Sequence, residues 1–503
     1  MIEYTFRSKK PLTQSIIDKL QLSKQGFQKQ HEHAITRYYL DSFDNRLISK
    51  NHILEVDKLA NNQHLTWYKD NHFQSATNLN KIPRFLNDFP AGPWKNRFKS
   101  ILKMRALLIQ TELHYEQSLY VLKNKEDKII LSIKIEINKE NPAYSRMRIT
   151  PVKGYDKALQ KFIGKLNNAL FLREEKTLYT KIVAKSLQNY PALKKHSPFK
   201  ATDNSIQACK TLLFQQYMTM KHNEQGTIDN SDSEFLHDFR IAIRKSRTAF
   251  GLLKNCYSKT ILAKFKPELA WLSQITSDTR DMDVYLLMFP SYRLAITAEM
   301  SPYLHPLEIH LALKQETAQQ QLRQHLCSDR YHKFCLDWSV FLQSNSQIND
   351  QGKLAQKAIP WTARKQIKNS FYQVINEGRV ITYPMDSEKY HDLRKTCKKL
   401  RYLLEFFRPI LIKDETLSLI KSLKVLQDNL GDFQDYEVQV EKIRLFSHEL
   451  TSVPPETFMA IGILTEYLQS KQEQAKMAFH DCFCQFNSTA NLQLIRAIIR
   501  KEK

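Results

Sequence analysis

The stretch that decides the fold is His237-Asp-Phe-Arg-Ile-Ala-Ile-Arg-Lys-Ser-Arg247, because it returns as His391-Asp-Leu-Arg-Lys-Thr-Cys-Lys-Lys-Leu-Arg401, 154 residues later. A second block repeats at the same spacing. Leu-Ala-Trp-Leu at 269–272, followed by acids at 278, 281 and 283, matches Leu-Lys-Val-Leu at 423–426 with acids at 432, 435 and 437. Two separated blocks that share one offset indicate a duplicated unit. Their apolar residues recur at helical spacing, which predicts an all-α domain.

Outward from this repeat, residues 1–190 have a different pattern. Apolar and polar residues alternate in Ile129–Ile137, as in a half-buried strand. Weaker strand candidates are Ile2–Arg7, Tyr38–Asp41, Leu65–Lys69 and Arg146–Thr150. So many short strands favour an antiparallel sheet or barrel. Residues 191–204 read as a linker, and 205–503 as the helical domain, with halves at about 205–345 and 353–503. The predicted class is therefore α+β, an antiparallel β-sheet or β-barrel domain followed by a duplicated helical domain.

The composition narrows the choice of partner. The chain has 76 Lys and Arg against 52 Asp and Glu, a net charge of +24, which favours a nucleic acid, an acidic membrane surface or a phosphate polymer. A merely solvated basic surface is the alternative. Only 10 glycines occur in 503 residues, which disfavours nucleotide folds built on glycine-rich loops.

Cysteine usage and hydropathy bear on the compartment. The seven cysteines are odd in number, and their spacing completes no zinc site, so we expect reduced thiols and no metal. The sequence shows neither a charged-then-apolar leader nor an apolar run long enough for a membrane helix. We therefore expect a cytoplasmic protein without a membrane partner. The oligomeric state stays open.

The repeated block places its cations on one helix edge. At 100° per residue, His237, Arg240, Arg244 and Arg247 fall within an arc of about 80°, with Lys245 at its border. The second copy repeats the stripe with His391, Arg394, Lys398, Lys399 and Arg401. Ser-Asp-Ser-Glu at 231–234 has capping-box spacing, which predicts that the first helix begins within a turn or two of the histidine.

Like charges at this spacing repel one another, so a stripe of them implies an anion alongside. That anion could be internal, because Asp278, Asp281 and Asp283, with their repeat counterparts, could pair with the cations. The stripes could also form an ordinary solvated face, and each histidine could be a packing residue. The functional interpretation is that two stripes, related by a pseudo-twofold axis, line one basic groove. Arginine suits phosphate because its planar fork donates two parallel hydrogen bonds.

Aromatic residues help to choose between polyanions. Proteins that bind single-stranded nucleic acid usually interleave aromatics with cations so that bases can stack. The two stripes offer almost none, and Tyr402 is the one candidate. Phosphate without bases is the better match, and nucleic acid is disfavoured as a partner.

The duplicated His-Asp-x-Arg helix and the paired Leu-x-x-Leu…Asp helix together resemble the CHAD domain, the conserved histidine α-helical domain, over about residues 201–503. The resemblance implies two four-helix bundles related by pseudo-symmetry, with inorganic polyphosphate bound in the basic cavity between them. By position it assigns binding to both stripes: His237, Arg240, Arg244, Lys245, Arg247, His391, Arg394, Lys398, Lys399 and Arg401. One departure is Gln434, which stands where the first repeat has Arg280.

The first 190 residues resemble a degenerate CYTH domain, the triphosphate tunnel fold, in the segment Tyr38–Leu47 and in Val-Lys-Gly at 152–154. The family's catalytic pattern is lost. Its opening Glu-x-Glu-x-Lys is Glu-Tyr-Thr-Phe-Arg at 3–7 here, its basic pair falls on Glu55 and Asp57, and its late acidic strand falls on Arg146 and Arg148. Since a metal needs clustered carboxylates, we infer that hydrolase activity is lost and that these acids pair with these arginines.

Taken together, these observations predict a non-catalytic protein that binds inorganic polyphosphate, needs no cofactor, and could sit on cytoplasmic polyphosphate granules. Two alternatives remain open at this point. One is a metal-dependent inorganic triphosphatase that uses the N-terminal tunnel. The other is a binder of nucleic acid or of an acidic protein.

Overall fold

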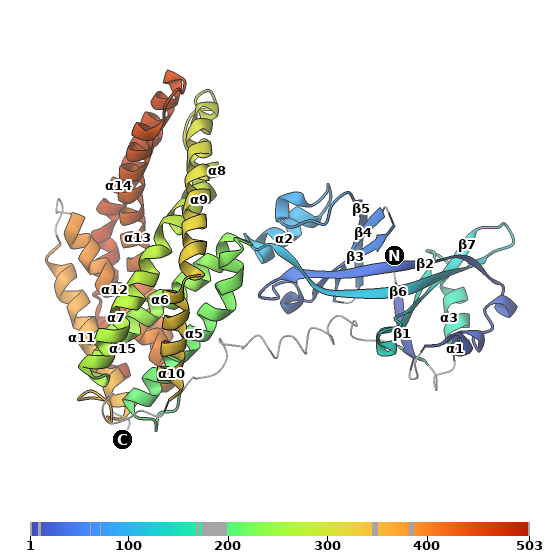
Figure 1. Cartoon of the computed structure of the whole chain (residues 1–503), viewed down its shortest axis with the longest axis horizontal. Coiled ribbons are helices and arrows are strands. Elements are labelled where there is room, and N and C mark those ends of the chain that lie inside the picture. The colour runs from blue at the N-terminus through green and yellow to red at the C-terminus, as the bar shows by residue number, and fades with distance from the viewer. Residues whose placement is uncertain are drawn as a thin grey trace. The chain divides into compact units, whose positions relative to one another are not determined.

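A computed structural model describes residues 3–8, 12–60, 62–70, 72–166, 171–173, 199–344, 351–381 and 387–500. Residues 191–198 of the predicted linker lie outside these ranges. The chain divides into two units, Met1–Ala192 and Leu193–Lys503. The first is built on strands and the second on helices, as predicted (Figure 1).

The N-terminal unit is one antiparallel sheet of nine strands in the order β5-β4-β3-β2-β6-β7-β8-β1-β9. The strands are β1 (Tyr4–Ser8), β2 (Phe27–Ser42), β3 (His52–Leu59), β4 (Asn62–Lys69), β5 (His72–Leu79), β6 (Leu107–Lys123), β7 (Ile129–Ile137), β8 (Arg146–Pro151) and β9 (Phe171–Arg173). Its helices are α1 (Gln14–Asp18), α2 (Trp94–Leu102) and α3 (Asp156–Lys165). Strands β2 and β6 pair along most of their length and form the spine of the sheet.

The alternation in β7 separates an apolar outer face from a polar inner one. Leu131, Ile133 and Ile135 are buried in a core that also includes Ile16 of α1 and Phe162 of α3. The intervening side chains, such as Lys134 and Glu136, line the concave face instead. The predicted strand is confirmed, and the sheet curls so that its charged face turns inward, as in a tunnel.

The helical unit contains α5 (Ser205–Ile228), α6 (Ser233–Leu252), α7 (Lys259–Ile275), α8 (Ser277–Ala295), α9 (His305–Leu326), α10 (Asp329–Gln343), α11 (Ile359–Arg379), α12 (Ser387–Phe407), α13 (Lys413–Glu449), α14 (Pro455–Phe486) and α15 (Thr489–Ile499). The 154-residue offset relates the first residues of α5 and α11, of α6 and α12, and of α7 and α13. It also relates the last residues of α8 and α13. The duplication inferred from two short blocks therefore extends through most of the unit.

Backbone hydrogen bonds link equivalent positions of the two halves. The Ser205 N–H donates to the Lys357 carbonyl at 2.8 Å, and the Ile359 N–H donates to the Asp203 carbonyl at 3.1 Å. Under the offset, Ser205 corresponds to Ile359 and Asp203 to Lys357, so the two bonds are each other's counterparts. A reciprocal pair of this kind is what a twofold relation between halves produces.

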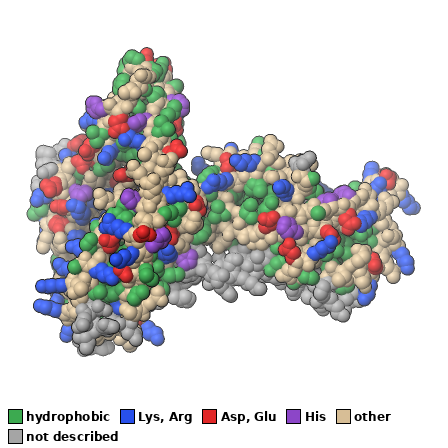
Figure 2. Space-filling model, in the orientation of Figure 1, with side chains coloured by type: hydrophobic (Ala, Val, Ile, Leu, Met, Phe, Trp, Pro, Cys, Tyr) green, Lys and Arg blue, Asp and Glu red, His purple; other side chains and the backbone are tan. Residues whose placement is uncertain are grey.

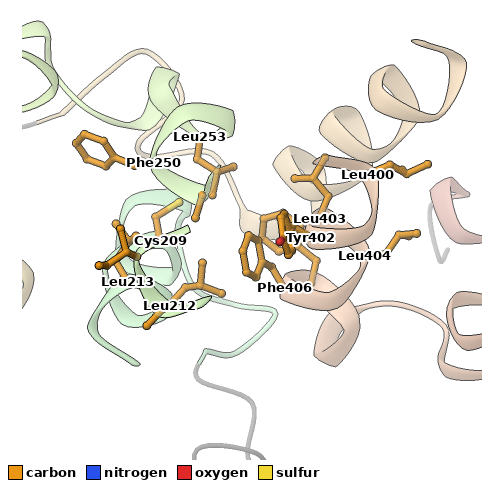
Figure 3. Close-up of a cluster of buried hydrophobic side chains, with 14 of the residues drawn as sticks. Cys209, Leu212, Leu213, Phe250, Leu253, Leu400, Tyr402, Leu403, Leu404 and Phe406 are labelled. Atoms are coloured by element: carbon orange, nitrogen blue, oxygen red, sulfur yellow. The ribbon is translucent and has the colours of Figure 1, made fainter. Parts of the chain in front are cut away.

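The two halves share one continuous core rather than two separate ones. Leu213 of α5 and Leu253, which directly follows α6, belong to the same buried cluster as Leu400 and Leu403 of α12, and Figure 3 shows these side chains between the helices. Tyr402 also lies in this core, with 3% of its surface exposed, and stacks on Phe406 at 5.9 Å. It is therefore closed to a nucleic-acid base.

Two helix pairs, α8–α9 and α13–α14, extend beyond the rest of the unit (Figure 1). They carry a core of their own, which contains Tyr285, Phe289 and Leu307 from the first half and Ile443 and Leu464 from the second. Because residues from both halves are buried in it, this core gives the extended region a fixed arrangement.

Candidate anion-binding site

Helices α6 and α12 orient the two stripes. In α6 the buried residues include Phe239, Ala242 and Ile243, and in α12 they include Leu393 and Cys397. The Asp232 side chain caps α6 by accepting hydrogen bonds from the backbone N–H groups of residues 234 and 235. The helix thus begins about one turn before His237, as the capping pattern predicts, although the cap is Asp232. With one face of each helix buried, the cationic edge is left on the other side.

Both stripes contribute to one open cavity of about 1010 Å³. From α6 it receives His237, Arg240 and Arg244, and from α12 it receives His391, Arg394 and Lys398. Six of the ten predicted binding residues are thus brought together across the two halves. Figure 2 shows Lys, Arg and His side chains grouped with a few acids on the visible face of the helical unit.

The other four predicted residues do not line this cavity. Lys245 is half-buried and Lys399 is exposed. Arg247 lines a neighbouring cavity, and Arg401 forms an ion pair with Glu405 at 3.5 Å. Lys245 and Lys399 border the stripe, and Arg247 and Arg401 lie about one turn further along their helices than Arg244 and Lys398.

Arg240 has a structural role as well as a place in the cavity. Its Nη1 donates to the Ser273 carbonyl at 3.2 Å, to Thr276 Oγ1 at 2.8 Å and to Ser277 Oγ at 3.2 Å, where α7 ends and α8 begins. Its counterpart Arg394 instead forms an ion pair with Asp435 at 2.9 Å. The two halves therefore hold equivalent arginines in different ways.

The two histidines also differ. His391 donates through Nδ1 to Oε1 of Gln434. In the first half the equivalent of Gln434 is Arg280, and burial together with this arginine lowers the pKa of His237. His237 is thus harder to protonate than an ordinary histidine, whereas His391 is oriented by an amide.

Lys398 is affected by both stripes. Burial lowers its pKa to about 8, and the nearby Arg394 and Arg244 contribute to the shift. Since Arg244 belongs to the other half, the two cationic edges are close enough to repel one another. A site that crowds cations in this way favours a bound anion.

Acids compensate the stripes only in part. Among the described residues, the ten predicted binding residues form two ion pairs, Arg394–Asp435 and Arg401–Glu405. Asp283 instead accepts a hydrogen bond from Gln315 at 3.0 Å, and burial raises its pKa to about 6. Of the acids considered for internal pairing, Asp435 therefore neutralises one of these cations, Arg394, and the cavity stays positive.

Sequence reasoning missed several cavity residues. The sequence shows Arg280 only as a mismatch between the repeats, and it gives no signal for Lys314, Lys442 or His310, which also line the cavity. The counterparts of Lys314 and Lys442 under the offset are a leucine and a methionine, so the duplication carries no signal for them. Altogether the lining has seven Lys and Arg against four Asp and Glu: Arg240, Arg244, Arg280, Lys314, Arg394, Lys398 and Lys442, against Asp278, Asp281, Asp435 and Glu449.

The N-terminal unit has its own charged interior. Arg148 forms an ion pair with Glu55 at 2.6 Å, and Arg146 does so at 3.3 Å, which confirms the predicted pairing for Glu55. The prediction for Asp57 is wrong, because this acid pairs with Arg37, its cross-strand neighbour in β2, at 2.6 Å. Asp57 lies directly opposite Arg37 in the ladder between β2 and β3, so it pairs with this arginine and not with those of β8.

Glu136 stands at the centre of this network. It accepts hydrogen bonds from Arg37 and Arg146 at 2.7 Å each, and Arg148 lies 3.4 Å away. Although burial opposes ionisation, Arg148 and Arg37 lower the pKa of Glu136 to about 2. A cavity of about 290 Å³ remains beside it, lined also by Glu3 and Lys134.

These residues do not fit a divalent metal, because arginines already occupy the oxygens that a metal would bind. Across the described residues, no three His, Cys, Asp or Glu side chains are grouped as a metal site would require. Likewise, none of the described helices combines the length and apolar character of a membrane span.

Comparison with known proteins gives one family match: residues 211–444 match the CHAD domain model. No curated protein is significantly similar to the chain. Among solved structures, the CHAD domain from the plant Ricinus communis is 21% identical, covering 61% of this chain and 98% of its own, with a TM-score of 0.45. PptA from Streptomyces chartreusis is 16% identical, covering 56% and 99%, with a TM-score of 0.44.

A third solved structure is also similar to the chain. An adenylyl cyclase candidate from Hippeastrum, described as having a dominant triphosphatase activity, is 11% identical. It covers 37% of this chain and 95% of its own, with a TM-score of 0.28.

The family match, residues 211–444, lies wholly within the helical unit and includes both cationic stripes. The chain therefore contains a CHAD domain.

Proposed function

We propose that this protein binds inorganic polyphosphate in the cavity between α6 and α12 and that it does so without catalysis. The observation that carries the proposal is the meeting of both cationic stripes in one open cavity with an excess of Lys and Arg. Polyphosphate supplies closely spaced charges along a flexible chain, which suits cations placed on two walls. In the cell, the protein would sit on cytoplasmic polyphosphate granules.

The choice of polyphosphate over nucleic acid rests on what surrounds the cations. The cavity's two buried aromatic residues, Tyr285 and Phe446, are part of the core of the extended helices. Tyr402, the stacking candidate, is enclosed. A nucleic acid would therefore gain phosphate contacts here without the base stacking that stabilises single strands on proteins.

The test is direct binding of polyphosphate to the full chain at several salt concentrations. Arg244→Ala with Lys398→Ala should weaken binding by more than about tenfold, because charge-assisted hydrogen bonds contribute about 1.5–3 kcal/mol each. The dependence of log affinity on log salt should flatten by about 1.4, since each phosphate contact contributes about 0.7. Arg240 is left unchanged because it also holds the α7–α8 junction.

A matched control removes the same charge elsewhere. Lys421 and Lys424 are exposed on α13 and line neither cavity of the α6 region, so their double alanine variant should bind nearly as the unmodified chain does. Equal affinity of the folded cavity variant and this control would reject the site. Competition with RNA at matched phosphate concentration separates a polyphosphate binder from a general polyanion binder.

A further inference from the structure

A second cavity, of about 620 Å³, lies next to the main one between α6 and α7. Four cations line it: Arg244, Arg247, Lys254 and Lys266. Its lining contains no carboxylate, and all four cations are exposed. Within the described residues, none of these four forms an ion pair with an acid. The cavity thus concentrates positive charge that the protein itself leaves uncompensated.

Arg244 connects the two cavities, because its side chain lines both. The cationic edge of α6 therefore continues from the main cavity, past Arg244, to Arg247 near the end of the helix. Lys254 follows directly after the helix, and Lys266 faces the same space from α7. A flexible anion that occupies the main cavity meets further cations in this direction.

The described residues of the second half carry fewer uncompensated cations at the equivalent positions. Under the 154-residue offset, Gly251 corresponds to Glu405 and Lys266 to Ile420. Glu405 forms an ion pair with Arg401, the counterpart of Arg247, at 3.5 Å. In the second half, the cation equivalent to Lys266 is therefore missing, and Arg401 is neutralised by Glu405. The pseudo-symmetry is broken here, because Arg244 and Lys254 have cationic counterparts, Lys398 and Arg408, whereas the counterpart of Arg247 is neutralised and Lys266 has no cationic counterpart.

We propose that the cavity between α6 and α7 is an extension subsite for polyphosphate, reached from the main cavity past Arg244. This inference rests on the proposed function and adds a direction and a length preference to it. A short chain fills the main cavity, whereas a long chain leaves it along α6 in the first half and gains contacts with Arg247, Lys254 and Lys266. Long chains therefore bind more tightly per molecule than inorganic triphosphate does.

Gly251 offers a sharp test, because a side chain there has room: an added Cβ would meet nothing within 4 Å. Gly251→Glu introduces the carboxylate that the second half carries, four residues after Arg247 as Glu405 follows Arg401. Gly251→Gln adds a side chain of the same size without the charge. Gly251 is exposed and lies within helix α6, so both substitutions should leave the protein folded.

Binding of the full chain to inorganic triphosphate and to long-chain polyphosphate is measured at low salt. Gly251→Glu should lower affinity for the long chain by about tenfold and leave affinity for triphosphate unchanged, because the added charge pairs with Arg247. Gly251→Gln should leave both affinities unchanged. Lys254→Ala with Lys266→Ala should flatten the salt dependence for the long chain by about 1.4 and not alter that for triphosphate.

The outcomes separate the two proposals. An unmodified chain that binds triphosphate and long polyphosphate equally well, or a Gly251→Glu variant that loses both ligands to the same extent, overturns the extension subsite and leaves the main cavity standing. If the unmodified chain binds neither ligand, the proposed function itself fails.

Discussion

Single residues decide how the cavity responds to pH, and Lys398 is the clearest case. It lies among Arg394 and Arg401 on its own helix, Arg244 on α6 and Asp435 on α13, and its pKa is lowered to about 8. A bound phosphate chain stabilises the charged amine and so raises this pKa. Binding above that value is therefore coupled to proton uptake, and affinity should fall as pH rises through 8, by up to about tenfold per pH unit.

The measurement is polyphosphate affinity at a series of pH values from neutral to alkaline. Lys398→Arg is the matched variant, because arginine keeps its charge throughout this range. Its affinity should be nearly independent of pH over the interval in which the unmodified chain weakens. A parallel decline in both proteins would assign the pH effect to another group.

At the scale of elements, the sequence predicts a strand or helix well where one of its faces is apolar and packs against the core. Strand β7 was predictable because Leu131, Ile133 and Ile135 alternate with polar residues and are fully buried. Strand β2 was found only in part, because most residues of its first half are exposed and polar. Strands β3, β5, β6 and β9 and helices α1 to α3 were not predicted. The missed strands are held in place by hydrogen bonds to neighbouring strands, and such pairing leaves no recognisable pattern in the local sequence.

The helices show the same limit. The duplication predicted α6 and α12 and six of the cavity residues, because both copies carry the motif. It did not predict that α13 runs without a break from Lys413 to Glu449, where the first half ends α7 and starts α8 around Thr276. Thr276 bonds back to the Leu272 carbonyl, and Arg240 holds this junction, whereas the second half has Leu430 and Gly431 there. Contacts between helices decide such a break.

Packing between α11 and α14 can be tested at a buried glycine. An added Cβ at Gly378 would lie 2.0 Å from Phe483 Cε2, so Gly378→Ala should destabilise the protein by about 1–3 kcal/mol through overpacking. Gly462 on α14 is the control, because nothing lies within 4 Å of its added Cβ. There alanine should stabilise by about 0.5–1 kcal/mol through helix propensity.

Thermal unfolding of the two variants against the unmodified chain provides the measurement. The expected shifts in melting temperature have opposite signs. A Gly378→Ala variant as stable as the original would show that Phe483 can move aside and that this helix contact is loose.

At the scale of the whole molecule, the N-terminal unit has a tunnel-like sheet whose carboxylates are engaged by arginines. We expect the full chain to release no phosphate from inorganic triphosphate above background with either Mg²⁺ or Mn²⁺, because Glu55 and Glu136 are already bound by Arg37, Arg146 and Arg148. The assay is phosphate release with and without metal. Metal-dependent turnover that Glu3→Gln abolishes would contradict this expectation and support the triphosphatase alternative.

The reciprocal bonds between Asp203–Ser205 and Lys357–Ile359 have a consequence for the origin of the molecule. A polypeptide with only the first half would leave these backbone groups, and the apolar surface beside them, without a partner. A second copy of that polypeptide could supply the same groups in the same geometry. The fused chain thus has the construction of a homodimer whose subunits became covalently joined, and joining freed each side to diverge, as Gly251 and Glu405 have done.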